Sequence, residues 1–194
     1  MSDKSVQKRN LIIDKAYDVF ALRGYRNVTM KDIVEACEIS RGGLYLYFSS
    51  TEEIFLAVLE REESKKEETI TDAQLKSLSN GELLLLFLKE QKKEILRKKN
   101  SLTVAKYEYA FLCREEKKAA PFRKQFETEA LVLEKILEKG NISGEFDCEN
   151  PHEEAGNMML AIEGMKLCAR TMGISENRVD REFMHMMKKF VVED

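Results

Sequence analysis

The chain of 194 residues has no tryptophan, only two prolines and no long apolar run. The apolar stretch Leu83–Leu88 is far shorter than the roughly 20 residues that span a membrane. The N-terminal sequence MSDKSVQKRN is charged and lacks the apolar segment of a signal peptide. We therefore expect a cytoplasmic protein with no membrane partner.

Catalytic and metal-binding patterns are also missing. The four cysteines (Cys37, Cys113, Cys148 and Cys168) form no CxxC pair, and two of them lie among apolar neighbours, which favours buried thiols. There is no GxSxG, no HExxH and no glycine-rich phosphate loop after a strand, and two histidines offer little acid–base chemistry. The sequence therefore predicts no metal site, no cofactor and no enzymatic activity.

What the chain does contain is helical periodicity. Apolar residues make up 43% and charged residues 35% of the sequence, no strand-like alternation occurs, and the prolines leave long stretches uninterrupted. We expect an all-α protein. Two short helices are predicted within 28–48. Further helices are predicted at about 6–23, 81–99, 102–116, 150–172 and 176–192, together with a long helix that begins at residue 51 and another that begins at Pro121.

The most informative stretch is VTMKDIVEACEISRGGLYLYFSSTEEIF, residues 28–55. Thr29 and Asp32 have the spacing of a helix N-cap and its partner three residues later, and Ser40 can cap a second helix, 41–48. Two short helices joined by a tight turn form the smallest unit that places a helix in the major groove of DNA. An ordinary helical hairpin is the alternative interpretation.

The second of these helices has an unusual composition. Gly42 and Gly43 weaken a helix but allow its backbone to approach another molecule closely. Leu44 and Phe48, four residues apart, are expected to face inward, which leaves three polar side chains outside: Arg41, Tyr45 and Tyr47. Such side chains suit contacts with phosphates and bases.

Charge is distributed unevenly along the chain. Residues 1–50 hold eight basic and six acidic residues, a net charge of +2, whereas the whole chain carries −3. A slightly basic end on an acidic body is typical of a protein that docks on DNA through one small surface. We expect a DNA-binding domain at 1–50 and a second domain at 51–194, with 51–75 as a linking helix that Ser50 and Glu53 cap. The expected core of the first domain is Ile12, Ala16, Val19, Phe20, Ile33, Leu44 and Phe48.

Residues 8–60 contain a predicted helix followed in order by three motifs: T-M-x-D-I, S-R-G-G-L-Y-x-Y-F and S-x-x-E-I-F. In this order the segment resembles the TetR/AcrR family of bacterial transcription regulators. The resemblance implies a three-helix DNA-binding domain and a C-terminal helical bundle for ligand binding and dimerisation. It places DNA contacts of the first motif helix at Thr29 and Lys31, base reading at Arg41, Gly42 and Gly43, and backbone contacts at Tyr45 and Tyr47. Ser49 and Thr51 stand where family members often carry lysine.

The resemblance also implies a homodimer and a small-molecule effector. We expect dimerisation through 150–172 and 176–192, whose apolar positions recur at helical spacing: Met159, Ile162, Met165, Leu167, Phe183, Met186 and Phe190. Candidate ligand-binding residues are Phe87, Tyr107, Glu108, Phe111, Phe126 and Met158. These aromatic residues are equally consistent with plain core packing, and a carboxylate such as Glu108 would favour a cationic ligand.

The leading hypothesis is thus a dimeric repressor that binds a palindromic DNA operator and is released by an effector. A ligand-independent regulator or activator whose C-terminal domain only dimerises is the alternative that the sequence leaves open.

Overall fold

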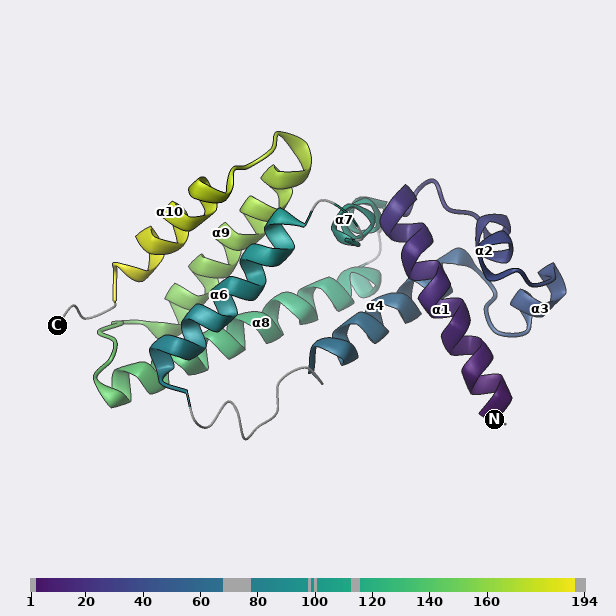
Figure 1. Ribbon diagram of the computed structural model, residues 1–194. Helices are drawn as coiled ribbons and strands as arrows, with labels where there is room; N and C mark the ends of the chain where they lie inside the picture. Colours follow the sequence, from purple (N-terminus) through teal and green to yellow (C-terminus); the bar gives the residue numbers. More distant parts are fainter. Residues whose placement is uncertain (1–2, 68–77, 98, 100, 113–115, 191–194) are drawn as a thin grey trace. The chain divides into compact units, whose positions relative to one another are not determined.

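The computed structural model describes residues 3–67, 78–97, 99, 101–112 and 116–190. Within these residues the chain forms helices joined by turns, with no strand, so the all-α prediction is confirmed (Figure 1). No helix among them is long and apolar enough to cross a membrane. Parts of four predicted helices lie outside the described residues: 68–75, 98, 113–115 and 191–192.

The chain divides into two units, and each unit is built from two separate stretches of the sequence. The first unit comprises Met1–Thr71 and Lys98–Arg114, and the second comprises Asp72–Arg97 and Glu115–Asp194. This division differs from the expected boundary at residue 50, because the fourth helix and the segment around residue 105 belong with the N-terminal helices. The physical reason lies in the core of the first unit.

The first unit contains α1 (Asp3–Arg23), α2 (Met30–Cys37), α3 (Arg41–Tyr45), α4 (Thr51–Glu67) and α7 (Thr103–Leu112). Helix α1 packs against α2, α4 and α7 (Figure 1). Six of the seven predicted core residues are buried: Ile12, Ala16, Phe20, Ile33, Leu44 and Phe48. Val19 is only half-buried, and Ile13 takes its place on the buried face of α1.

Aromatic side chains join α7 to α1 and α4. The ring of Phe55 lies 4.8 Å from that of Phe20, 4.9 Å from Tyr25 and 5.3 Å from Tyr109, measured between centroids. The Tyr109 hydroxyl donates a hydrogen bond to Glu52 at 3.0 Å. Rings at these separations attract one another beyond the area they bury. From the sequence this segment is expected in the second domain, because no local pattern indicates a partner so distant in sequence.

The second unit is a bundle of α6 (Asn80–Leu96), α8 (Glu116–Ser143), α9 (Pro151–Thr171) and α10 (Glu176–Met187). Helix α9 packs against α6 and α8, and α10 packs against α6. As predicted, Asn150 caps α9 and Pro151 begins it. Helix α8 starts five residues before Pro121, contrary to expectation, because a proline just past the first turn removes only one helical hydrogen bond.

The apolar residues expected at the dimer interface lie elsewhere. Six of the seven are buried within the core of a single chain: Met159, Ile162, Met165, Phe183, Met186 and Phe190. Only Leu167 is exposed, at 40%. That residue assignment was wrong because the buried stripe of an amphipathic helix has the same period as a dimer face.

One carboxylate ties the loop after α8 to the start of α6. Glu145 accepts hydrogen bonds from the backbone N–H of Gly81 (2.9 Å), the side-chain amide of Asn80 (2.7 Å) and the hydroxyl of Ser143 (2.8 Å). These donors, the Gly81 N–H first, lower the pKa of Glu145 to about 2 from its usual 4.5. The charged form of Glu145 therefore stabilises the fold.

We expect Glu145→Gln to lower the melting temperature at neutral pH and to reduce the acid sensitivity of the protein. The stabilisation from Glu145 is fully present above pH 4.5 and is lost as the pH falls toward 2, because the folded pKa is depressed. Melting curves from pH 7 to pH 2 measure this, with Glu149→Gln, an exposed carboxylate nearby, as the control. Parallel curves for the wild type and Glu145→Gln would contradict the role of this cap.

Candidate DNA-binding site

Helix α2 begins with the capping arrangement that the sequence predicted. The Asp32 N–H donates to the Thr29 hydroxyl oxygen at 3.3 Å, and the Thr29 N–H donates to the Asp32 carboxylate at 2.8 Å. The side-chain and backbone hydrogen bonds from Thr29 lower the pKa of Asp32, which also pairs with Arg23. Lys31 lies on the exposed side of α2, and its ammonium is 3.7 Å from the Glu35 carboxylate. Both residues that were predicted to contact DNA from α2 thus lie at the surface of the unit.

The turn between α2 and α3 is held by backbone geometry and a second cap. Glu38 adopts the left-handed conformation with φ 53°, and its N–H donates to the Glu35 carbonyl. The Ser40 hydroxyl then accepts a hydrogen bond from the Gly43 N–H at 3.1 Å, which confirms Ser40 as the N-cap of α3. These contacts fix the direction in which α3 leaves the turn.

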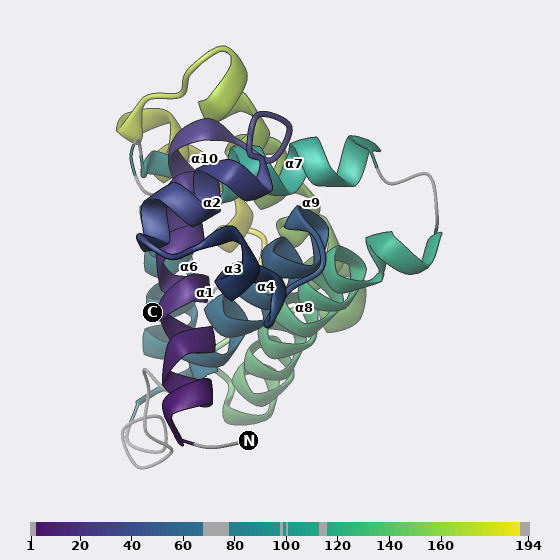
Figure 2. The ribbon, with the colours of Figure 1, turned by 90° about the vertical axis from the view of Figure 1, so that its right-hand side faces the viewer.

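Helix α3 is shorter than predicted and ends at Tyr45 instead of residue 48. Its inward side is as expected, with Leu44 and Phe48 fully buried. Arg41 and Tyr45 are exposed, the Arg41 guanidinium lying 5.6 Å from the centre of the Tyr45 ring, whereas Tyr47 is half-buried. Figure 2 shows α2 and α3 with the turn that joins them.

The two glycines of α3 have different surroundings. A Cβ atom at Gly42 would meet nothing within 4 Å, so the backbone there is open to an incoming molecule. A Cβ atom at Gly43 would lie 3.1 Å from the Ser40 hydroxyl, so Gly43 leaves room for the N-cap. Helix α3 thus exposes the side chains of Arg41 and Tyr45 beside the open backbone of Gly42.

The start of α4 differs in detail from the predicted capping box. The Ser50 hydroxyl accepts from the Glu53 N–H at 3.1 Å, as expected. The Glu53 carboxylate, however, accepts from the N–H (2.6 Å) and hydroxyl (2.8 Å) of Ser49 and not from Ser50. These bonds, the backbone one first, lower the pKa of Glu53. Ser49 therefore holds the turn between α3 and α4.

The six candidate ligand-binding residues fall on both units. Tyr107, Glu108 and Phe111 belong to α7 in the first unit, and the other three to α6, α8 and α9 in the second. Glu108 accepts a hydrogen bond from the Arg26 N–H at 3.0 Å, beside the turn that follows α1. Phe87 and Phe126 pack against the core of the second unit, and Met158 lies inside it.

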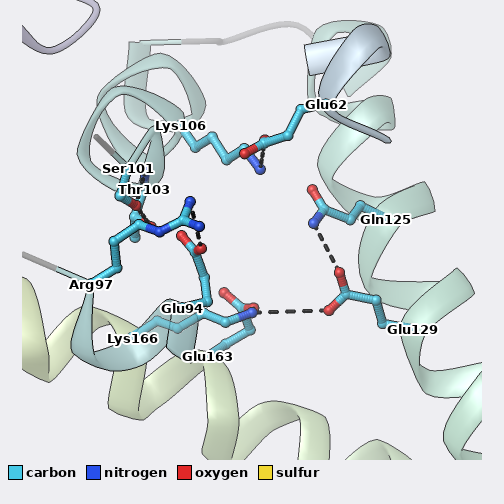
Figure 3. Close-up of polar contacts among 10 residues, drawn as sticks. All are labelled: Glu62, Glu94, Arg97, Ser101, Thr103, Lys106, Gln125, Glu129, Glu163 and Lys166. Atoms are coloured by element: carbon cyan, nitrogen blue, oxygen red, sulfur yellow. Dashed lines mark hydrogen bonds and ion pairs between the residues drawn. The ribbon is translucent and has the colours of Figure 1, made fainter. Parts of the chain in front are cut away.

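The second unit contains a polar cluster that no pattern in the sequence predicts. The Lys166 ammonium lies 2.7 Å from the Glu163 carboxylate and 3.9 Å from that of Glu129 (Figure 3). Glu129 also accepts hydrogen bonds from the side-chain amides of Gln91 (3.2 Å) and Gln125 (3.0 Å). Lys166 and Gln91 are buried. Buried charges in a helical bundle need partners, and here polar groups from three helices supply them.

Among the described residues, no group of three or more His, Cys, Asp or Glu side chains is arranged to hold a metal ion. Cys37 and Cys148 are buried free thiols and Cys168 is a half-buried one, while Cys113 lies outside the described residues. Burial raises the pKa of the Cys37 and Cys148 thiols, which makes them less reactive.

Comparison with known proteins identifies the first unit's helical hairpin. Residues 12–58 match the model of bacterial regulatory proteins of the tetR family, and residues 83–180 match the tetracyclin repressor-like C-terminal domain. The chain belongs to the TetR family. It is therefore a DNA-binding transcriptional regulator of a family that is generally not enzymatic, and α2 and α3 are its helix-turn-helix.

Similar proteins cover both units of this TetR-family regulator. The HTH-type transcriptional regulator YfiR of Bacillus subtilis is 31% identical over 143 residues, which cover 72% of this chain and 68% of that protein. QacR of Staphylococcus aureus, also an HTH-type regulator, is 35% identical over 41% of this chain and 42% of its own length. A transcriptional regulator from Saccharomonospora viridis, solved in complex with choline, has the same fold with a TM-score of 0.78. It is 18% identical, and the match covers 97% of this chain and 100% of that one.

Proposed function

We propose that this regulator is a repressor that binds a palindromic operator as a homodimer and is released by a small-molecule effector. The observation that supports DNA docking most directly is the surface of α3, where Arg41 and Tyr45 are exposed beside the open backbone of Gly42. Arg41 is suited to pair with the two acceptors of a guanine, and the tyrosine hydroxyls to contact phosphates. Thr29 and Lys31, at the start of α2, add contacts to the DNA backbone.

We expect Arg41→Ala to cost about 1–3 kcal/mol of operator binding and to relax specificity at one base pair of each half-site. Arg41→Lys should bind random DNA as the wild type does but should lack its specificity, because lysine keeps the charge and loses the planar fork. Tyr47→Phe should weaken binding to all sequences alike. Fluorescence anisotropy on an operator selected from random duplexes measures each case, against an unrelated duplex. Equal losses for Arg41→Ala on both duplexes would contradict base reading.

The exposed apolar side chains of α9 and α10 support a dimer through these two helices. Leu160 is 64% exposed and Leu167 40% exposed on α9, and Met184 is 54% exposed on α10. Gly164 lies between the two leucines in the α9 sequence, and a Cβ atom there would meet nothing within 4 Å. Exposed leucines on either side of a glycine allow a helix of a second copy to approach closely. Two-fold symmetry then requires half-sites about 34–36 Å apart, or a multiple of that spacing.

The effector is proposed to act on the second unit. The cluster around Lys166 contains two carboxylates and one ammonium, so its net charge favours a positively charged ligand. The structurally similar regulator from Saccharomonospora viridis was solved with choline, which is a cation. Of the candidate residues from the sequence, Phe87, Phe126 and Met158 belong to this unit and would supply apolar contacts.

Release from DNA would require the effector to favour a dimer whose two copies of α3 no longer match the half-sites. Reversing a 99:1 population takes roughly 5.5 kcal/mol of differential affinity. Helices α4 and α7 are the candidate transmission elements, because both belong to the first unit and the chain runs from them into the second. Within the first unit they are joined by the Lys106–Glu62 ion pair at 2.7 Å (Figure 3).

A regulator that ignores ligands and uses its second unit only to dimerise is the alternative. A thermal-shift screen of small apolar and cationic compounds separates the two, since a ligand that binds the folded state raises its melting temperature. Compounds that raise the melting temperature and also weaken operator binding support the repressor. Operator affinity that stays constant across the screen would leave the ligand-independent form.

A further inference from the structure

An exposed leucine follows directly after α3, the helix proposed to enter the major groove. Leu46 is the C-cap residue of α3, and 82% of its surface is exposed. Its φ and ψ of −69° and −20° are helical, and its N–H donates to the Gly42 carbonyl at 3.3 Å. Leu46 therefore continues the helical register of α3, one turn after Gly42.

This register places Leu46 at the centre of the outward face. Successive residues of a helix are rotated by about 100°, so Gly42 and Leu46 lie on the side roughly opposite the buried Leu44 and Phe48. Gly42 has no side chain, and open space surrounds it. Arg41 lies to one side, against the Tyr45 ring. Leu46 is thus the large side chain that projects from the middle of this face.

The chemistry of Leu46 limits what it can recognise. Its side chain has no hydrogen-bond donor or acceptor, so it can form no hydrogen bond with phosphates or with the polar edges of bases. In the major groove the apolar group that a base presents is the 5-methyl group of thymine. With a glycine one turn earlier, the helix backbone can approach the groove closely enough for the leucine to reach that methyl group.

We propose that Leu46 reads the 5-methyl group of a thymine in each operator half-site. This assignment rests on the proposed docking of α3 in the major groove, and it adds a specificity residue that has no polar contact. It predicts a thymine requirement at one symmetric position of the operator, separate from the position that Arg41 reads.

Replacement of thymine by deoxyuridine tests the proposal, because it removes the methyl group and leaves every hydrogen-bonding group in place. The full-length protein first selects its operator from random duplexes, and each thymine is then exchanged in both half-sites. At one position the wild type should lose about four-fold in affinity per half-site, the factor expected for one methyl-sized apolar group. Leu46→Ala should bind the thymine and deoxyuridine operators equally, whereas Leu46→Met should keep the preference.

Leu22→Ala is the matched control, since Leu22 is a leucine of α1 that is 84% exposed, and this variant should keep the full sensitivity to deoxyuridine. If Leu46→Ala responds to deoxyuridine as the wild type does, or if the wild type shows no sensitivity at any position, the assignment is overturned while operator binding stands. If the full-length protein selects no duplex, the proposed docking through α3 fails, and the role of Leu46 fails with it.

Discussion

Replacing Phe55 with alanine is expected to lower the free energy of unfolding of the first unit by about 3–5 kcal/mol. Phe55 is fully buried, and its ring contacts those of Phe20, Tyr25 and Tyr109. Its removal leaves a cavity where α1, α4 and α7 meet, and the surrounding rings cannot all relax into it. Operator binding should fall as well, because α4 supports the helices that carry the DNA-binding face.

The composition offers a selective measurement of this effect. All six tyrosines lie within the first unit and there is no tryptophan, so tyrosine fluorescence during urea unfolding reports on this unit alone. Phe111→Ala is the matched control, since Phe111 is a phenylalanine of α7 that is 79% exposed, and its removal should change stability by less than about 0.5 kcal/mol. A loss below about 1 kcal/mol for Phe55→Ala would show that the aromatic cluster does not hold α7 to this unit.

The second large effect is expected at the proposed dimer face. The double substitution Leu160→Glu and Leu167→Glu should convert the dimer into a monomer, because it places four carboxylates across a two-fold interface that is apolar in the wild type. Operator affinity should then fall by about 10²–10⁴-fold, since the second half-site no longer benefits from the linked copy. Sedimentation velocity at micromolar concentration measures the first effect, and anisotropy on the full operator measures the second.

Ile142→Glu serves as the control for the dimer face. Ile142 is 87% exposed on α8 of the same unit, so its substitution adds the same charge to an exposed aliphatic position outside α9 and α10. This variant should remain dimeric and bind the operator normally. A wild-type monomer at micromolar concentration, or dissociation by Ile142→Glu alone, would contradict a dimer through α9 and α10.

The helix-turn-helix was predictable because its signals are local. The caps at Thr29 and Ser40 depend on residues three positions away, and the inward side of α3 follows from the spacing of Leu44 and Phe48. The length of α3 was overestimated, since apolar spacing continues to Phe48 while the α-helix itself ends at Tyr45. Leu46 was overlooked for a similar reason: its exposure depends on how the turn after α3 packs.

The sequence by itself determined the helical class and the helix-turn-helix with its caps. These properties follow from hydrophobic periodicity and from side chains that bond to backbone groups nearby in sequence. Only the tertiary structure decided that α7 joins the first unit, that Glu129, Glu163 and Lys166 form one cluster, and that the apolar stripe of α9 and α10 faces inward. Each of these depends on contacts between residues that are distant in sequence. An amphipathic stripe shows that a helix buries one side, but its partner is set by the packing of the whole chain.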